Sequence, residues 1–124
     1  MAVIPAPSGA THELPGTRFT SLATPSRGTV ETAVWRVEID AGVEPTSHSL
    51  TREEVFVVLE GTATVEIDGE REVASRGDAI AVPAETPFVL ANGGDGALRL
   101  LCCLPVGGQA RMGEQDPFTP PWAQ

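Results

Sequence analysis

The chain has 124 residues, which is enough for one domain with a hydrophobic core and too few for two ordinary domains. Its proportions of hydrophobic (41%) and charged (20%) residues are those of a soluble globular protein. Seventeen acidic and eight basic side chains give a net charge of −9, which argues against nucleic acid or an anionic membrane as a partner.

Residues 1–16 are rich in proline, glycine and alanine, and we interpret them as an N-terminal arm or loop. The arm has no basic n-region and prolines interrupt its apolar residues, so we do not expect a signal peptide. The two cysteines, Cys102 and Cys103, are adjacent, and neighbouring strand residues point to opposite faces, so a disulfide between them is not expected. Reduced thiols indicate a cytoplasmic protein.

Beyond the arm, short apolar segments alternate with turns, and no segment shows a sustained helical period. Alternation of apolar and polar residues predicts strands over residues 29–40 and 62–67. Short segments bounded by turn signals predict further strands over residues 19–22, 48–59, 70–73, 79–82, 88–90 and 97–104. Asp68 and Gly69 are typical of a two-residue hairpin turn, because both positions of that turn accept positive φ. Short strands with turn signals at about every 8–12 residues indicate one all-β domain, a sandwich or a barrel.

The segment from Gly42 to Gly61 carries the candidate site. Alternate side chains of a strand share a face, and one face here collects His48, Leu50, Arg52, Glu54, Phe56 and Val58. The other face is apolar from Val55 to Leu59, so we expect this strand to be covered on both sides. A histidine and a glutamate on one apolar face indicate a site or the remnant of one.

Two segments resemble the signatures of the cupin family. The first signature is Gly-x5-His-x-His-x3/4-Glu-x6-Gly, and the residues that match it in register are Gly42, His48, Glu54 and Gly61. The second is Gly-x5-Pro-x-Gly-x2-His-x3-Asn, matched by Gly77, Pro83 and Asn92. The chain departs from the signatures at Leu50, Glu85 and Phe88. The resemblance implies the cupin double-stranded β-helix, a jelly-roll barrel over residues 17–106.

The resemblance also implies a metal site inside the barrel, normally held by three histidines and one glutamate. Only His48 and Glu54 remain at those positions, because Leu50 and Phe88 cannot coordinate a metal. Catalytic metal sites generally keep three protein ligands, so no tightly bound cofactor is expected. A divalent metal stays an alternative if a third ligand comes from Glu85, Cys102, Cys103 or His12.

A carboxylate in an apolar barrel is costly to keep charged. We therefore expect Glu54 either to pair with His48 or to have a raised pKa. Strand residues six apart are about 20 Å apart when fully extended, so direct contact requires a bend near Thr51 and Arg52. The expected pocket lining is His48, Leu50, Glu54, Phe56, Phe88 and Leu90; equally, the apolar members of this set can simply fill the barrel.

Residues 107–124 contain two large apolar side chains, Phe118 and Trp122, in a chain with few aromatics. We interpret this stretch as a tail docked on the barrel or on a neighbouring subunit. The resemblance to cupins implies a homodimer.

Three functions follow from these observations. The first is binding of a small, largely apolar molecule in the barrel lumen, without a tightly bound catalytic metal. The second is an enzyme, either a metal-dependent oxygenase or an isomerase or cyclase with Glu54 or His48 as acid or base. The third is a non-catalytic dimeric partner or regulatory module.

Overall fold

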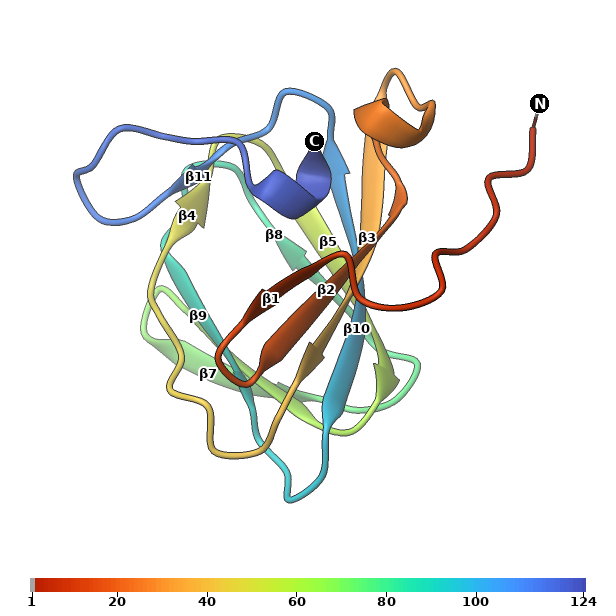
Figure 1. Ribbon diagram of the computed structural model, residues 1–124. Helices are drawn as coiled ribbons and strands as arrows, with labels where there is room; N and C mark the ends of the chain where they lie inside the picture. The colour runs from red at the N-terminus through yellow and green to blue at the C-terminus, as the bar shows by residue number, and fades with distance from the viewer. Residues whose placement is uncertain (1) are drawn as a thin grey trace.

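The computed structural model describes residues 2–124, and its regular structure is almost entirely β-strand (Figure 1). The strands are β1 (His12–Leu14), β2 (Thr17–Ala23), β3 (Thr32–Ile39), β4 (Ser49–Leu50), β5 (Glu54–Glu60), β6 (Ala63–Ile67), β7 (Glu70–Ala74), β8 (Ala79–Val82), β9 (Phe88–Asn92), β10 (Leu98–Pro105) and β11 (Ala110–Arg111). Two short 3₁₀ helices, η1 (Pro25–Arg27) and η2 (Pro121–Ala123), complete the fold. Within the described residues, no helix is long and apolar enough to cross a membrane.

The strands form a barrel from one large and two small antiparallel sheets. The large sheet has the order β1-β2-β3-β10-β5-β8, and the smaller sheets are β7-β6-β9 and β11-β4. Figure 1 shows the sheets curving around a common interior, and their inward side chains form one buried cluster. The all-β barrel predicted from the sequence is confirmed.

Strand β10 lies at the centre of the large sheet, between β3 and β5. Its even-numbered side chains, from Leu98 to Leu104, are buried in the core, whereas the alternate ones, such as Arg99, point outward. In the sequence this stretch is an almost continuous apolar run, so the period of two appears in its burial and not in its residue types. Cys102 therefore faces the core and Cys103 the outer face, and both thiols are free.

Two short strands were missed by the sequence analysis. Strand β1 lies within residues 1–16, which we interpreted as an arm or loop, and it pairs with β2. Strand β11 lies within the tail and pairs with β4 through the partners Ala110 and Leu50. Two or three residues are too few to show an alternating pattern in the sequence. Only pairing with a neighbouring strand defines these two strands.

The expected strand over residues 48–59 is interrupted. Strands β4 and β5 are separated by residues 51–53, where the chain bends. The Thr51 backbone N–H donates to the Gln109 carbonyl (2.9 Å), and the Gln109 N–H donates to the Thr51 hydroxyl (2.9 Å). The tail thus holds the bend, and Arg52 turns to solvent instead of joining the inward face.

The expectation that β5 is covered on both sides is wrong for the single chain. The side chains of Glu54, Phe56 and Val58 are buried, but those of the opposite face are not. Val55 and Val57 are half-buried and Leu59 is 40% exposed. No described part of the chain lies over this outer face, so its apolar pattern has no explanation within one barrel.

Residues 107–124 pack on the barrel of their own chain. The Trp122 ring stacks on Phe19 of β2, with centroids 3.7 Å apart and planes 7° from parallel. The Ser21 hydroxyl donates to the Trp122 carbonyl at 2.8 Å. In Figure 1 the blue C-terminal segment crosses one end of the barrel, next to β1 and β2.

Gly61 and Gly77 separate two reasons for a glycine in a turn. Both have positive φ, 87° and 91° respectively. A Cβ on Gly61 would lie 2.6 Å from the Ala97 carbonyl oxygen, whereas a Cβ on Gly77 would meet nothing within 4 Å. At Gly61 a glycine is favoured both by the positive φ and by the lack of room for a Cβ. At Gly77 only the positive φ favours it.

We predict that Gly61→Ala destabilises the protein more than Gly77→Ala. Left-handed backbone costs each variant about 1–2 kcal/mol, and the clash with the Ala97 carbonyl adds about 1 kcal/mol or more for Gly61→Ala alone. Urea denaturation followed by circular dichroism measures both. Equal free energies of unfolding for the two variants would show that the Ala97 carbonyl does not lie as close to Gly61 as described.

Candidate functional site

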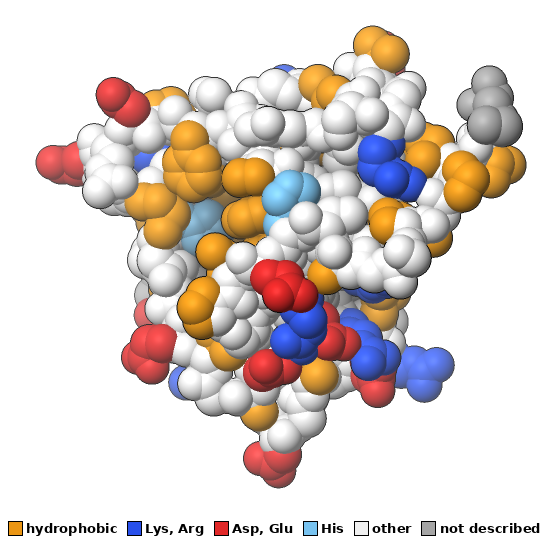
Figure 2. All heavy atoms as spheres, in the orientation of Figure 1, with side chains coloured by type: hydrophobic (Ala, Val, Ile, Leu, Met, Phe, Trp, Pro, Cys, Tyr) orange, Lys and Arg blue, Asp and Glu red, His pale blue; other side chains and the backbone are white. Residues whose placement is uncertain are grey.

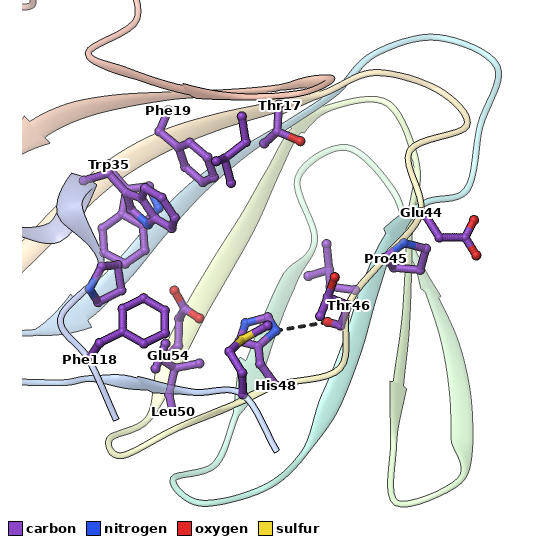
Figure 3. Close-up of a pocket in the computed structure, with 16 residues that line it drawn as sticks. Thr17, Phe19, Trp35, Glu44, Pro45, Thr46, His48, Leu50, Glu54 and Phe118 are labelled. Carbon is purple, nitrogen blue, oxygen red and sulfur yellow. Dashed lines mark hydrogen bonds between the residues drawn. The ribbon is translucent and has the colours of Figure 1, made fainter. Parts of the chain in front are cut away.

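A cavity of about 360 Å³ opens at the end of the barrel where β4 and the tail lie (Figure 3). Its wall is mainly hydrocarbon, and the apolar lining residues are Leu14, Phe19, Trp35, Pro45, Leu50, Leu90, Ala110, Met112, Phe118, Pro120 and Trp122. The polar ones are Thr17, Glu44, Thr46, His48 and Glu54. In Figure 2, hydrophobic and histidine side chains gather on this face of the molecule.

His48 is placed by backbone pairing with β9. Its N–H donates to the Phe88 carbonyl at 3.2 Å, and the Phe88 N–H donates back at 2.9 Å. The two rings are 4.5 Å apart between centroids. The two signature positions thus meet in space, but a phenyl ring stands where the resemblance implies an imidazole.

The His48 ring has a defined tautomer. Its Nδ1 lies 3.1 Å from the Thr46 carbonyl oxygen, which can only accept, so Nδ1 carries the proton. Burial lowers the pKa of His48 from its ordinary value, opposed by the hydrogen bond to Thr46. The neutral ring therefore offers an unprotonated Nε2 as a hydrogen-bond acceptor.

Glu54 is the first residue of β5, just after the bend. Its side chain lines the cavity, yet the residue is only 4% exposed. Among the described residues, no side chain or backbone group forms a hydrogen bond or ion pair with its carboxyl group. Burial without a partner raises the pKa of Glu54 to about 8, so the group is mostly protonated at neutral pH.

The bend brings His48 and Glu54 to one cavity. No hydrogen bond or ion pair joins their side chains within residues 2–124. Of the two outcomes expected for Glu54, the raised pKa holds and the pairing with His48 does not. Burial also raises the pKa of the Cys102 and Cys103 thiols, and the nearby charge of Glu54 adds to both shifts.

Of the six expected lining residues, four line the cavity: His48, Leu50, Glu54 and Leu90. The expectation was wrong for the other two, Phe56 and Phe88. They are buried in the core with ring centroids 5.9 Å apart. Alternation placed them on the inward face but does not report depth along the barrel axis, so core and cavity positions look alike in sequence.

None of the four residues considered as a third metal ligand lies at the cavity. Glu85 is exposed and ion-paired with Arg111 at 2.7 Å. Cys102 is buried in the core and Cys103 faces the outer side of β10. The His12 ring is held by the Thr11 hydroxyl at 2.9 Å on β1.

The donor set does not fit a resident metal ion. Within the described residues, no three His, Cys, Asp or Glu side chains come together as a metal would need. Glu44 also lines the cavity, but Figure 3 shows its carboxylate pointing away from His48 and Glu54. The neutral His48 ring could offer its Nε2 to a metal, but the Glu54 carboxyl would first have to lose its proton, because metal binding requires deprotonated donors.

The aromatic wall is the part of the site that sequence reasoning missed. Phe19 and Trp35 come from β2 and β3, and Phe118 and Trp122 come from the tail. The available signal was composition: the chain has only six aromatic residues, four phenylalanines and two tryptophans, and four of the six line this cavity. Their convergence depends on how the tail folds back, which no local pattern reports.

Strand order, jelly-roll barrel and an end-on cavity define the class: a β-barrel protein with an internal site. A family model described as the cupin domain matches residues 35–104, more than half of the chain. The chain belongs to the cupin family, as its two signatures predicted.

Among curated proteins, the uncharacterized protein MJ1618 of Methanocaldococcus jannaschii is 38% identical over 53 residues. That match covers 43% of this chain and 42% of the relative, so the chain spans under half the length of that protein.

Two solved structures show the fold. A cupin-like protein from Thermotoga maritima superposes with a TM-score of 0.70 at 20% identity, covering 77% of this chain and 74% of the other. Salicylate 1,2-dioxygenase from Pseudoaminobacter salicylatoxidans, solved as adducts with gentisate, gives a TM-score of 0.69 at 21% identity over 90% of this chain and 31% of the other. Likeness at this identity establishes the barrel and not the chemistry.

The raised pKa of Glu54 predicts a pH-dependent stability. The folded protein holds a proton on Glu54 up to pH about 8, whereas the unfolded chain releases it near the ordinary pKa of 4.5. Stability from this group is therefore complete below pH 4.5 and falls by roughly 1.4 kcal/mol per pH unit until pH about 8. Glu54→Gln, which cannot ionise, removes this slope, so the variant is more stable than the parent at pH 9.

Urea denaturation at pH 5, 7 and 9 checks this expectation. Glu53→Gln is the matched control, because Glu53 is the exposed neighbour of Glu54. That control keeps the parent slope. If Glu54→Gln and Glu53→Gln change the stability identically across this range, the raised pKa of Glu54 is wrong.

Proposed function

We propose that this cupin binds a small, largely apolar molecule in its barrel cavity, without a tightly bound catalytic metal. The observation that carries the proposal is a cavity of about 360 Å³ with four aromatic side chains and few polar groups in its wall. Small-molecule sites typically measure about 300–1,000 Å³ and combine an apolar wall with a few placed polar groups. The residues of the metal-binding signature positions support the metal-free form, since Leu50 and Phe88 replace two ligands.

An enzyme is the second candidate, and one observation favours it. A carboxylic acid with a pKa of about 8 in an apolar cavity can donate a proton at neutral pH, as a general acid must. An isomerase or cyclase with Glu54 as acid and His48 Nε2 as acceptor fits this geometry. A metal-dependent oxygenase has less support, because the donor set does not hold a metal.

Intrinsic fluorescence tests the binding proposal. Both tryptophans, Trp35 and Trp122, line the cavity, and the chain has no tyrosine, so its fluorescence reports on the site directly. Titration with phenethyl alcohol, a small neutral aromatic probe, is expected to shift the emission and saturate. Leu90→Trp fills part of the cavity and lowers the affinity about tenfold or more, measured by calorimetry to avoid the added fluorophore.

Val73→Trp serves as the control, because Val73 is 64% exposed and lies outside the cavity. This variant binds the probe like the parent. Saturable binding that survives Leu90→Trp unchanged would place the probe elsewhere and refute the cavity as the binding site.

We further propose that two copies pair through the outer face of the large sheet. Two cross-strand rows lie there side by side, Val34-Cys103-Val55-Ala81 and Arg36-Leu101-Val57-Ala79. Seven of these eight side chains are apolar, and charges of both signs border them at Glu38, Arg99 and Glu60. A second copy related by a two-fold axis can match apolar rows to apolar rows and opposite charges to each other.

Leu101→Arg is expected to give a particle of half the parent's mass by light scattering after gel filtration, because it places a charge inside the apolar rows. Val30→Arg is the control, since Val30 is 82% exposed and lies outside those rows. A parent protein with the mass of one chain at micromolar concentration would refute the pairing.

We also assign the protein to the cytoplasm. The support is chemical: both thiols are free, and adjacent strand positions direct Cys102 and Cys103 to opposite faces.

A further inference from the structure

We infer that the cavity is built for an apolar molecule that carries a protonated amine, with the ammonium group beside the Glu54 carboxylate. The inference rests on the proposed binding function and names the chemical class of the ligand. The central group is the carboxyl of Glu54, the one buried acidic group in the cavity wall among the described residues.

Glu54 is 4% exposed and lines the cavity, with no hydrogen-bond or ion-pair partner among the described residues. Its carboxyl group can be satisfied only by something that enters the cavity. A buried carboxylate without a partner is among the costliest arrangements in a protein, so a group that supplies both charge and hydrogen bonds gains the most there.

The protein does not supply that positive charge itself. The chain has no lysine, and none of its eight arginines lines the cavity. Arg18 and Arg99 pair with Glu38 on the outer face, and Arg111 pairs with Glu85. An anionic ligand would therefore meet no cationic side chain in the wall, and it would be repelled wherever Glu54 ionises.

The rest of the wall suits an aromatic or aliphatic amine. Phe19, Trp35, Phe118 and Trp122 line the same cavity as Glu54. Aromatic faces attract ammonium groups and also bury the hydrocarbon part of such a ligand. The net charge of −9 raises the local concentration of cations around the whole molecule.

Binding of an ammonium group moves one proton in a balanced way. In the free protein at neutral pH, Glu54 is mostly a neutral acid, because burial raises its pKa to about 8. When the ammonium binds, Glu54 becomes a carboxylate and its proton passes to solvent, while the ammonium keeps its own. Affinity for an amine therefore rises about tenfold from pH 6 to pH 7 and levels off above pH 8.

The other titratable groups around Glu54 do not produce this profile. Burial lowers the pKa of His48, so this ring loses its proton at lower pH than an ordinary histidine, whereas the profile expected for Glu54 extends to pH about 8. The thiols of Cys102 and Cys103 have raised pKa values and stay protonated. Glu44 is exposed and its carboxylate points away from the cavity (Figure 3).

The test uses three probes with one phenyl body and different head groups: phenethylamine, phenethyl alcohol and hydrocinnamate. Calorimetry at pH 8 is expected to rank them amine, alcohol, acid, with at least a tenfold gap between amine and alcohol. At pH 7, titrations in buffers of different ionisation enthalpy are expected to show about 0.9 proton released per amine bound. The alcohol releases none.

Glu54→Gln is expected to abolish both the preference for the amine and the proton release, while phenethyl alcohol still binds. Glu53→Gln is the matched control and keeps both, because Glu53 is exposed and does not line the cavity. The number of protons released per amine bound is measured on the parent protein, so it tests the inference even if a variant folds poorly.

The outcomes separate the two proposals. If the alcohol binds as tightly as the amine at pH 8, or if no proton is released, the amine assignment is overturned and the binding function stands. If none of the three probes binds, the proposed function fails and the amine assignment fails with it.

Discussion

The properties of this site depend on one carboxyl group that lies unpaired in a cavity lined mainly by hydrocarbon. Glu54 sits at the start of β5, with buried neighbours on the same face and no cation within reach. Such a group must either stay protonated or find a partner, and burial raises its pKa to about 8. The bend after β4 directs this side chain into the cavity, and the tail supplies apolar wall and no cation around it.

The barrel keeps the cupin geometry while changing its chemistry. His48 and Phe88 still exchange backbone hydrogen bonds, so the two signature segments meet where the family pattern places them. The replaced side chains are hydrocarbon, and Phe88 packs against His48 and Phe56 in the core. Even Glu85, where the signature has glycine, keeps the left-handed backbone with φ of 60°. The backbone geometry of the cupin signatures is therefore present although two of the metal-binding side chains are absent. Strand pairing uses backbone groups and does not depend on what the side chains coordinate.

The same distinction explains what the sequence could predict. Alternation and turn residues report local geometry, and they located the main strands and the hairpin at Asp68–Gly69, whereas the bend before Glu54 was implied only by the resemblance to cupins. Strands β1 and β11 escaped because two or three residues carry no period. Alternation also could not tell that Phe56 and Phe88 lie deeper than the cavity, since it reports the face of a strand and not the depth.

The cavity depends on residues of the tail, which lie far along the chain from His48 and Glu54. Five of the residues around the cavity come from beyond position 107: Ala110, Met112, Phe118, Pro120 and Trp122. Their placement relies on pairing of β11 with β4 and on the stack of Trp122 on Phe19. The tail, which forms part of the cavity wall, is thus held in place by β2 and β4 of the barrel. A ligand that contacts both the tail and the barrel would favour the docked tail, and loosening the tail would weaken that ligand by the same coupling free energy. Ligand affinity and tail docking would therefore be coupled equilibria, because tail residues and Glu54 line the same cavity.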